Sequence, residues 1–239
     1  MYPLRPALSA AWVVLASIGI GTAISLSPLI APSGSLMMPL GRTWAKSILR
    51  VAGVKVRFEG VEHLSAKDKH AGPFIFMANH ASALDILCIA PALPNNNRWL
   101  AKRSLQWIPF FGWAMLATGG CVFIERGDHE RARESLRKAA ERIRNGLCMV
   151  VFPEGTRSKD GHLLEFKKGP FHLAAEARVP IVPVALIGTS ALLPSGSMGI
   201  QSGEVLVRFG EPLEIKEGET HVEIAARTRV ALEKLLAAA

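Results

Sequence analysis

FIFMANHASALD, residues 74–85, is the stretch that decides the fold. Its first half is an apolar run of the length of a buried strand, and the polar residues Asn79 and His80 follow at once. A short helical pattern begins near Asp85. We therefore expect His80 at the carboxyl end of a strand and Asp85 in the first turn of a helix, which is the strand-to-helix step of an α/β protein.

The same alternation of apolar runs and helical patterns continues on both sides of this stretch. It predicts a mostly parallel or mixed sheet flanked by helices, in one domain that covers residues 53–239. Asp128 is a candidate cap of the best-marked helix, and Gly146 is expected to end it. We expect strands at residues 55–58, 74–78, 99–101, 121–125, 148–152, 181–186 and 205–209, and helices at residues 84–90, 129–145, 170–178 and 221–236.

Charge is distributed unevenly along the 239-residue chain. The formal net charge is +8, from 28 basic and 20 acidic residues, and the residues before Glu59 contribute +6 of it. The same region contains 36 consecutive uncharged residues, between Arg5 and Arg42. Disorder and a disulfide scaffold explain such a segment poorly, and a protein that binds duplex nucleic acid carries its charge as a stripe on the folded domain. The pattern therefore favours a membrane surface as the partner and argues against nucleic acid.

Residues 1–52 are expected to form a two-helix membrane-attachment segment. Residues 7–30 are apolar over 24 positions, and about 20 suffice to cross the hydrocarbon core as a helix. Residues 40–51 have an apolar face opposite a basic stripe, which is typical of an amphipathic helix in the membrane interface. The apolar face carries Leu40, Trp44, Ile48 and Val51, and the stripe carries Arg42, Lys46 and Arg50.

The apolar segment has alternative interpretations. A cleaved signal peptide has an apolar core of about 7–15 residues, shorter than this segment, and a buried hairpin of a soluble protein is a second alternative. A helix that spans the bilayer and a hairpin that dips into one leaflet fit the sequence equally well. In either case the basic residues after the apolar run place the remaining chain on the cytoplasmic side.

His80 and Asp85 can form a catalytic pair. Residues five apart point about 140° away from each other on a continuous helix, so the two side chains meet only if His80 lies in the loop. There, Asp85 would orient the imidazole, which takes a proton from an attacking hydroxyl as a general base. The alternative is that Asp85 only caps the helix beside an incidental histidine. Ser82 is interpreted as a turn residue, and the sequence has no G-x-S-x-G serine motif.

Basic residues follow the ends of other predicted strands. The run at residues 148–152 leads into PEGTRS, where Gly155 lets backbone N–H groups converge on an anion and Arg157 can form two hydrogen bonds with phosphate. Each basic residue alone is typical of a solvated surface charge, but the carboxyl ends of parallel strands share one edge of a sheet. We therefore expect a phosphate site near His80. The other basic residues after strand ends are Lys102, Arg103 and Arg126.

The three cysteines carry no motif. Cys88, Cys121 and Cys148 lie in apolar runs, and their spacings match no paired metal-ligand pattern. We expect them to be buried small side chains in a reducing compartment, and we expect no metal ion or other cofactor.

These residues resemble the glycerophospholipid acyltransferases, specifically the bacterial 1-acyl-sn-glycerol-3-phosphate acyltransferases with the H-x4-D motif. The resemblance covers about residues 50–215, with four blocks in the family's order. Glu125 departs from the pattern, because many members have Asp there, and this leaves the placement of Arg126 open. The blocks are NHASALD (79–85), KRSLQWIPFFG with GCVFIER (102–112 and 120–126), FPEGTRS (152–158) and VPIVPVAL (179–186).

The resemblance implies the glycerolipid acyltransferase fold and a specific reaction. An acyl group would pass from an acyl carrier protein or coenzyme A thioester to the sn-2 hydroxyl of 1-acyl-glycerol-3-phosphate (lysophosphatidic acid). The product would be phosphatidic acid, made for phospholipid biosynthesis at the cytoplasmic face of the bacterial inner membrane. His80 would be the general base, oriented by Asp85. The implied acceptor-binding residues are Lys102, Arg126, Glu154, Gly155, Thr156 and Arg157.

Several assignments stay open. Residues 98–145 hold ten basic and five acidic side chains, which suits an acidic carrier protein or a phosphorylated donor, but a solvated helix face explains them equally well. An acyltransferase for another lysolipid, such as lyso-ornithine lipid, is the nearest alternative. A non-catalytic module that binds anionic lipid would not need the His80–Asp85 pair, and a thioester hydrolase would release fatty acid without an acceptor.

Overall fold

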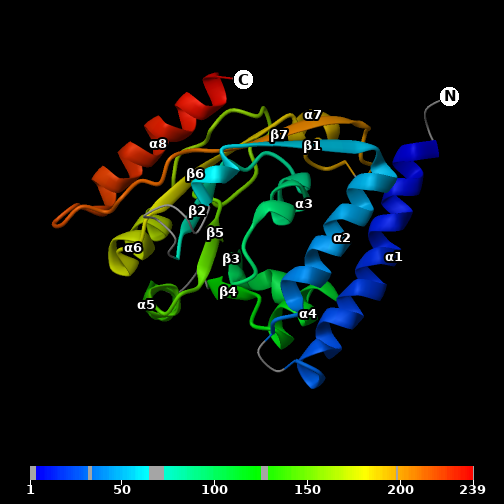
Figure 1. Cartoon of the computed structure of the whole chain (residues 1–239), viewed down its shortest axis with the longest axis horizontal. Coiled ribbons are helices and arrows are strands. Elements are labelled where there is room, and N and C mark those ends of the chain that lie inside the picture. Colours follow the sequence, from blue (N-terminus) through cyan, green and yellow to red (C-terminus); the bar gives the residue numbers. More distant parts are fainter. Residues whose placement is uncertain (1–3, 32–33, 65–72, 125–128, 198, 239) are drawn as a thin grey trace.

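β2 (Ile75–Ala78), the strand predicted from the FIFMA run, lies in the middle of a seven-stranded sheet (Figure 1). The computed structural model describes residues 4–31, 34–64, 73–124, 129–197 and 199–238, and within them the strand order is β1-β7-β6-β2-β5-β3-β4. The other strands are β1 (Val54–Glu59), β3 (Asn97–Lys102), β4 (Cys121–Ile124), β5 (Cys148–Val151), β6 (Ile181–Ile187) and β7 (Gly203–Phe209).

Helices cover both faces of this sheet (Figure 1). The α-helices are α1 (Leu4–Leu26), α2 (Met37–Ala52), α3 (Leu84–Ile89), α4 (Phe111–Ala117), α5 (His129–Arg144), α6 (Lys168–Ala177), α7 (Thr189–Leu192) and α8 (His221–Ala237). Short 3-10 helices are η1 (Ser27–Leu29), η2 (Val61–Leu64), η3 (Ala90–Ala92) and η4 (Arg103–Trp107).

Strand direction brings the predicted functional segments to one edge of the sheet. β6, β2, β5, β3 and β4 are parallel to one another, whereas β7 runs antiparallel to β6 and pairs in parallel with β1. The carboxyl ends of the five parallel strands therefore meet at the same edge, where α/β proteins bind their ligands. The mostly parallel, mixed sheet predicted from the sequence is confirmed.

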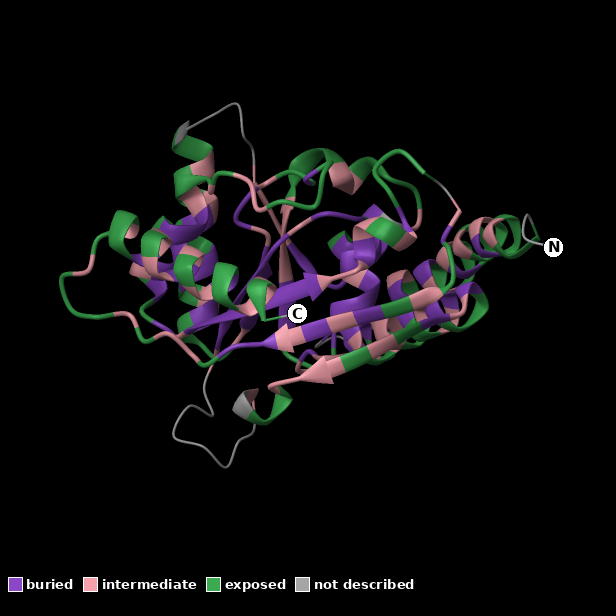
Figure 2. Cartoon of the chain, turned by 90° about the horizontal axis from the view of Figure 1, so that it is seen from above, coloured by how far each residue is buried: buried purple, intermediate pink, exposed green. Residues whose placement is uncertain are grey.

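Successive side chains of β2 alternate between two hydrophobic cores. Phe76 and Ala78 belong to a core shared with α2 and α3, whereas Ile75 and Met77 belong to a core shared with α5, α6 and α8. The strands in the middle of the sheet are buried almost throughout (Figure 2). Because these strands are covered on both faces, their sequences read as continuous apolar runs instead of alternating ones.

α2 is amphipathic as predicted, and protein covers part of its apolar face. Ile48 and Ala52 are fully buried in the core on the α2 face of the sheet, and Arg42 donates a hydrogen bond to Asn95 Oδ1 at 2.7 Å. In the basic stripe, Lys46 remains exposed to solvent. Ile48 of the predicted apolar face is therefore covered by protein, whereas Val51 of the same face is 37% exposed, and contact of this helix with lipid stays a prediction.

α1 presents the exposed apolar surface instead. Within the described residues, Leu4–Leu29 is one helical stretch long and apolar enough to cross a membrane, and only a small part of it is buried inside the protein. The helix packs against α2 and α4 on one side, and Leu8 and Leu15 are exposed on another. This surface is consistent with membrane association.

The other predicted elements can be compared directly. All seven predicted strands and four predicted helices occur within a few residues of their expected bounds, and Gly146 follows α5 with a left-handed φ of 98°. Asp128, the candidate cap, lies outside the described residues. α4 and α7 were not predicted. Cys88, Cys121 and Cys148 are buried and unpaired, as expected.

Candidate active site

The His80–Asp85 pair forms in the loop between β2 and α3. His80 Nδ1 lies 2.7 Å from Asp85 Oδ2, and Asp85 is fully buried in the first turn of α3. The same oxygen accepts hydrogen bonds from the backbone N–H groups of Ala81 at 2.8 Å and Ser82 at 2.9 Å. An oxygen with these donors favours a proton on Nδ1, which leaves the Nε2 lone pair available as a base. The predicted loop geometry is confirmed.

Ser82 has a structural place in this loop. It is fully buried, its hydroxyl donates to the Leu193 carbonyl at 2.7 Å, and it accepts a hydrogen bond from the Leu84 N–H at 3.1 Å. These contacts fit the predicted turn residue and give the hydroxyl no role as a nucleophile.

Two side chains fasten the loop to the neighbouring strands. Asn79 donates from Nδ2 to the Leu186 carbonyl at 3.0 Å and accepts from the Leu186 N–H at 2.7 Å, which ties the end of β2 to β6. On the other side of β2, the Ser158 N–H donates to the His80 carbonyl at 2.8 Å. The histidine is therefore held through its backbone by the segments on both sides.

Glu154 is a buried support for the same loop. One carboxylate oxygen accepts the His80 N–H at 2.7 Å and the other accepts the Leu164 N–H at 2.9 Å, and the residue is only 1% exposed. Burial raises the pKa of Glu154, and the two backbone hydrogen bonds oppose this increase. Both oxygens thus contact protein, whereas the resemblance implied a contact with the acceptor.

Phe152 is a site residue that the sequence reasoning did not single out. Its ring stacks on the His80 imidazole with centroids 4.0 Å apart and planes inclined by 18°, and the Trp99 ring lies 6.4 Å from the Phe152 ring. The position directly after a strand end, beside PEGTRS, was the available signal. The phenyl ring fixes the plane of the imidazole whose Nδ1 is held by Asp85.

A cavity of about 390 Å³ opens beside His80. Its apolar walls come from α1, α2, β3 and α4, and its polar lining comes from strand ends. The apolar lining includes Ile20, Ile24, Met38, Trp44, Trp99 and Met115, and the strand-end lining comprises Lys102, Gly155, Thr156 and Arg157.

The predicted phosphate residues therefore converge only in part within the described structure. Lys102, Thr156 and Arg157 line the same cavity as His80, and Gly155 turns the chain there with a φ of 69°. Arg126 lies outside the described residues, so its position relative to the cavity stays a prediction. No cluster of three or more His, Cys, Asp or Glu side chains suited to a metal ion occurs in the part of the chain that the structure describes.

Comparison with known proteins identifies the family. Residues 55–187 match the protein-family model described as Acyltransferase. The 1-acyl-sn-glycerol-3-phosphate acyltransferase of Saccharomyces cerevisiae is 36% identical over 220 residues, which are 89% of this chain and 69% of the yeast protein. The chain belongs to the 1-acyl-sn-glycerol-3-phosphate acyltransferase family.

Other members of the family agree with this assignment. A chloroplastic 1-acyl-sn-glycerol-3-phosphate acyltransferase of Brassica napus is 37% identical over 175 residues, and the alignment spans 73% of this chain and about half (49%) of the plant protein. The crystal structure of the 1-acyl-sn-glycerophosphate acyltransferase PlsC of Thermotoga maritima superposes with a TM-score of 0.81 at 25% identity, covering 99% of this chain and 98% of that one. The likeness therefore includes the N-terminal helices.

Proposed function

We propose that this chain transfers an acyl group from an acyl thioester to the sn-2 hydroxyl of 1-acyl-glycerol-3-phosphate, forming phosphatidic acid. The observation that carries the proposal is that His80, held by Asp85, lines an apolar cavity that Lys102 and Arg157 also line. One cavity thus combines a base, two cations and space for an acyl chain.

The proposed reaction needs no covalent acyl-enzyme. His80 Nε2 takes the proton of the sn-2 hydroxyl while the hydroxyl oxygen attacks the thioester carbonyl carbon. Collapse of the tetrahedral intermediate re-forms the carbonyl and breaks the C–S bond, and the imidazolium returns its proton to the departing thiolate. Asp85 stabilises the imidazolium throughout, as in other histidine–carboxylate pairs.

Lys102 and Arg157 would hold the acceptor phosphate, with the backbone at Gly155 and Thr156 shaping the turn around it. Arg126 is proposed as a third phosphate ligand from the family resemblance. Glu154 is proposed to act indirectly, by positioning the His80 backbone. Apolar side chains of α1 and α2 in the cavity lining would receive the acyl chain.

Membrane attachment is proposed to occur through residues 1–52, with α1 either spanning the bilayer or dipping into one leaflet. Its largely exposed apolar surface supports this, and the basic residues that follow favour the cytoplasmic face of the bacterial inner membrane. The catalytic cavity, whose wall includes α1, would then open close to its lipid substrate.

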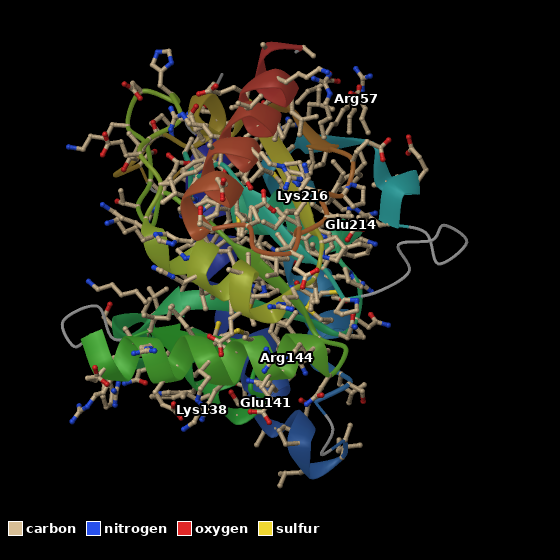
Figure 3. All side chains as sticks on the ribbon, turned by 90° about the vertical axis from the view of Figure 1, so that its left-hand side faces the viewer. Arg57, Lys138, Glu141, Arg144, Glu214 and Lys216 are labelled. Carbon is tan, nitrogen blue, oxygen red and sulfur yellow. The ribbon has the colours of Figure 1, made fainter. Side chains whose placement is uncertain are left out.

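Acyl carrier protein or coenzyme A is the proposed form of the donor. The exposed side of α5 carries Lys138, Glu141 and Arg144 (Figure 3). Part of its positive charge is engaged within the protein, because Lys138 pairs with Glu134 at 3.4 Å and Arg144 donates to the Glu176 carbonyl at 2.8 Å. Turnover with acyl carrier protein thioester and with coenzyme A thioester distinguishes the two acyl donors.

An acceptor assay tests the proposal. Purified protein is given a labelled acyl thioester, either carrier-bound or coenzyme A-bound, with lysophosphatidic acid or with lyso-ornithine lipid. We expect phosphatidic acid as the product and no turnover by His80→Ala. Product only from lyso-ornithine lipid would contradict the phosphate acceptor, fatty acid release without acceptor would indicate a hydrolase, and vesicle binding without turnover would indicate a non-catalytic module.

A further inference from the structure

Residues 103–117, which form η4 and α4, expose an unusual set of large apolar side chains next to α1. Trp107 is 75% exposed, Trp113 and Leu116 are each 51% exposed, and Ile108 is 44% exposed. Trp113 and Leu116 are three residues apart on α4, so they share a helix face. Scattered exposed apolar residues are ordinary, but a concentrated group marks a binding surface. We name residues 103–117 the tryptophan segment.

This segment is fixed against α1. Phe110 adopts a left-handed φ of 62° and packs on Gly21 so closely that a Cβ added to Gly21 would lie 3.0 Å from the Phe110 Cβ. Figure 1 shows α4 beside the half of α1 that leads into η1. Near that end, Leu29 and Ile30 are also strongly exposed. Exposed apolar side chains therefore occur on two neighbouring elements, the end of α1 and the tryptophan segment.

We propose that the tryptophan segment is a second bilayer-contact element, which enters the same leaflet as α1 and places Trp107 and Trp113 at the level of the lipid headgroups. Tryptophan is enriched there because its ring is apolar while its N–H remains hydrated. Arg103, exposed at the start of the segment, supplies a positive charge that suits anionic headgroups. An acidic carrier protein would be matched by cations more than by exposed indole rings.

The location of the segment gives this contact a consequence for catalysis. Leu105, Ala114 and Met115 line the catalytic cavity, and Ile20 and Ile24 of α1 line it as well. A bilayer that covers the outer side of both elements lies directly against the cavity wall. A lysolipid acyl chain could then pass from the leaflet into the cavity without crossing water. This inference rests on the proposed membrane attachment and lipid acceptor.

Site-specific labelling of the full-length protein tests the inference. Cys88, Cys121 and Cys148 are buried, so an introduced surface cysteine can be labelled selectively with a polarity-sensitive NBD fluorophore. The three variants are Leu116→Cys in the tryptophan segment, Leu15→Cys on the exposed side of α1, and Val230→Cys on α8 as a matched exposed apolar position. Leu116→Cys keeps both tryptophans. Vesicles contain phosphatidylethanolamine and phosphatidylglycerol, with or without a fraction of spin-labelled lipid.

When vesicles are added, we expect the fluorescence emission of the labels at positions 116 and 15 to shift to shorter wavelength and to be quenched by spin-labelled lipid. The emission of the label at position 230 should show neither change. Quenching at 15 without quenching at 116 would overturn the inference and leave attachment through α1 intact. Quenching at neither position would contradict the proposed attachment itself. A blue shift at 116 that grows with protein concentration in the absence of vesicles would mean that a second copy covers the segment.

A second measurement compares the vesicle affinity of variants that lack the exposed tryptophans. Trp107→Gln combined with Trp113→Gln should weaken vesicle binding roughly tenfold, because buried indole area is lost from the membrane contact. Val222→Gln combined with Val230→Gln, at two exposed apolar positions of α8, should leave binding unchanged. The Trp113 ring also lies 5.5 Å from the Phe110 ring, so the melting temperature of both double variants is measured, and binding is compared at a temperature where both are folded. Equal vesicle affinity of the two double variants would contradict the inference.

Discussion

Replacing Glu154 by glutamine separates two roles for this residue. Its carboxylate accepts one backbone N–H with each oxygen, from His80 at 2.7 Å and from Leu164 at 2.9 Å, and it is 1% exposed. Glutamine has one oxygen and one NH₂ group, so one of the two backbone donors must face another donor. A buried donor left without a partner costs about 1–3 kcal/mol. We expect the free energy of unfolding of Glu154→Gln to fall by about that amount.

The same change should reduce catalysis through geometry. The lost contact loosens the backbone of His80, and a displacement of about 1 Å in a catalytic group can cost about 10²-fold in rate. We therefore expect kcat to fall by about 10²-fold while KM for the acceptor changes little. Burial raises the pKa of Glu154, so the measurements are made on the alkaline side of the activity profile, where the carboxylate is ionised and differs most from the amide.

Urea unfolding and steady-state kinetics of the purified variant provide the assay. Glu217→Gln, at an exposed position, is the matched control and should leave both quantities unchanged. If Glu154→Gln instead raised KM for the acceptor, with unchanged kcat and unchanged stability, Glu154 would contact the substrate and the assigned supporting role would be refuted.

Three further predictions concern the cavity. Phe152→Leu removes the ring stacked on His80 and should lower kcat by up to about tenfold, since an aromatic contact of this kind contributes about 0.5–1.5 kcal/mol; an unchanged kcat would exclude a positioning role. Arg157→Ala should reduce kcat/KM for lysophosphatidic acid by about 10–100-fold through loss of a charge-assisted phosphate contact, and an equal loss with a lysolipid that lacks phosphate would argue against that contact. Deletion of residues 1–52 should lower solubility and activity, because it removes Ile48 and Ala52 from the buried core as well as the α1 membrane contact; a soluble, active truncation in sedimentation and turnover assays would show that these helices are dispensable.

The strands were predictable because each is a short apolar run that ends in polar residues. Strands buried on both faces can hold few polar side chains, so runs such as CMVV in β5 stand out. α4 was not predictable in the same way, because Pro109 and Gly112 read as loop residues. The helix nevertheless begins after Phe110, whose positive φ of 62° turns the chain there, and Phe110 packs against Gly21 of α1.

It is harder to predict what a helix face packs against than to predict the helix itself. The spacing of apolar residues in α2 predicts a buried stripe, but it cannot distinguish burial in lipid from burial in protein. In the structure the sheet core covers Ile48, and the lipid-like exposure belongs to α1. The periodicity of apolar residues predicts that a helix face is buried, but it does not predict whether protein or lipid covers that face.

The same distinction applies to the site. The His80–Asp85 contact depends only on a loop and the helix that follows it, so local reasoning was sufficient. The positions of Phe152 and Glu154 depend on β5 lying next to β2, a pairing between strands that are distant in sequence. A strand order of this kind leaves no local signal in one sequence, and both supporting roles became visible only in the folded sheet.

Acceptor-dependent acyl transfer by the wild type and His80→Ala is the measurement that tests the central claim most directly. With lysophosphatidic acid and an acyl thioester, the wild type is expected to form phosphatidic acid and one thiol for each acyl group transferred. His80→Ala is expected to show a rate at least about 10²-fold lower, the smallest loss typical of removing a general base. Wild-type activity retained by His80→Ala, or thiol release that does not depend on the acceptor, would contradict the account.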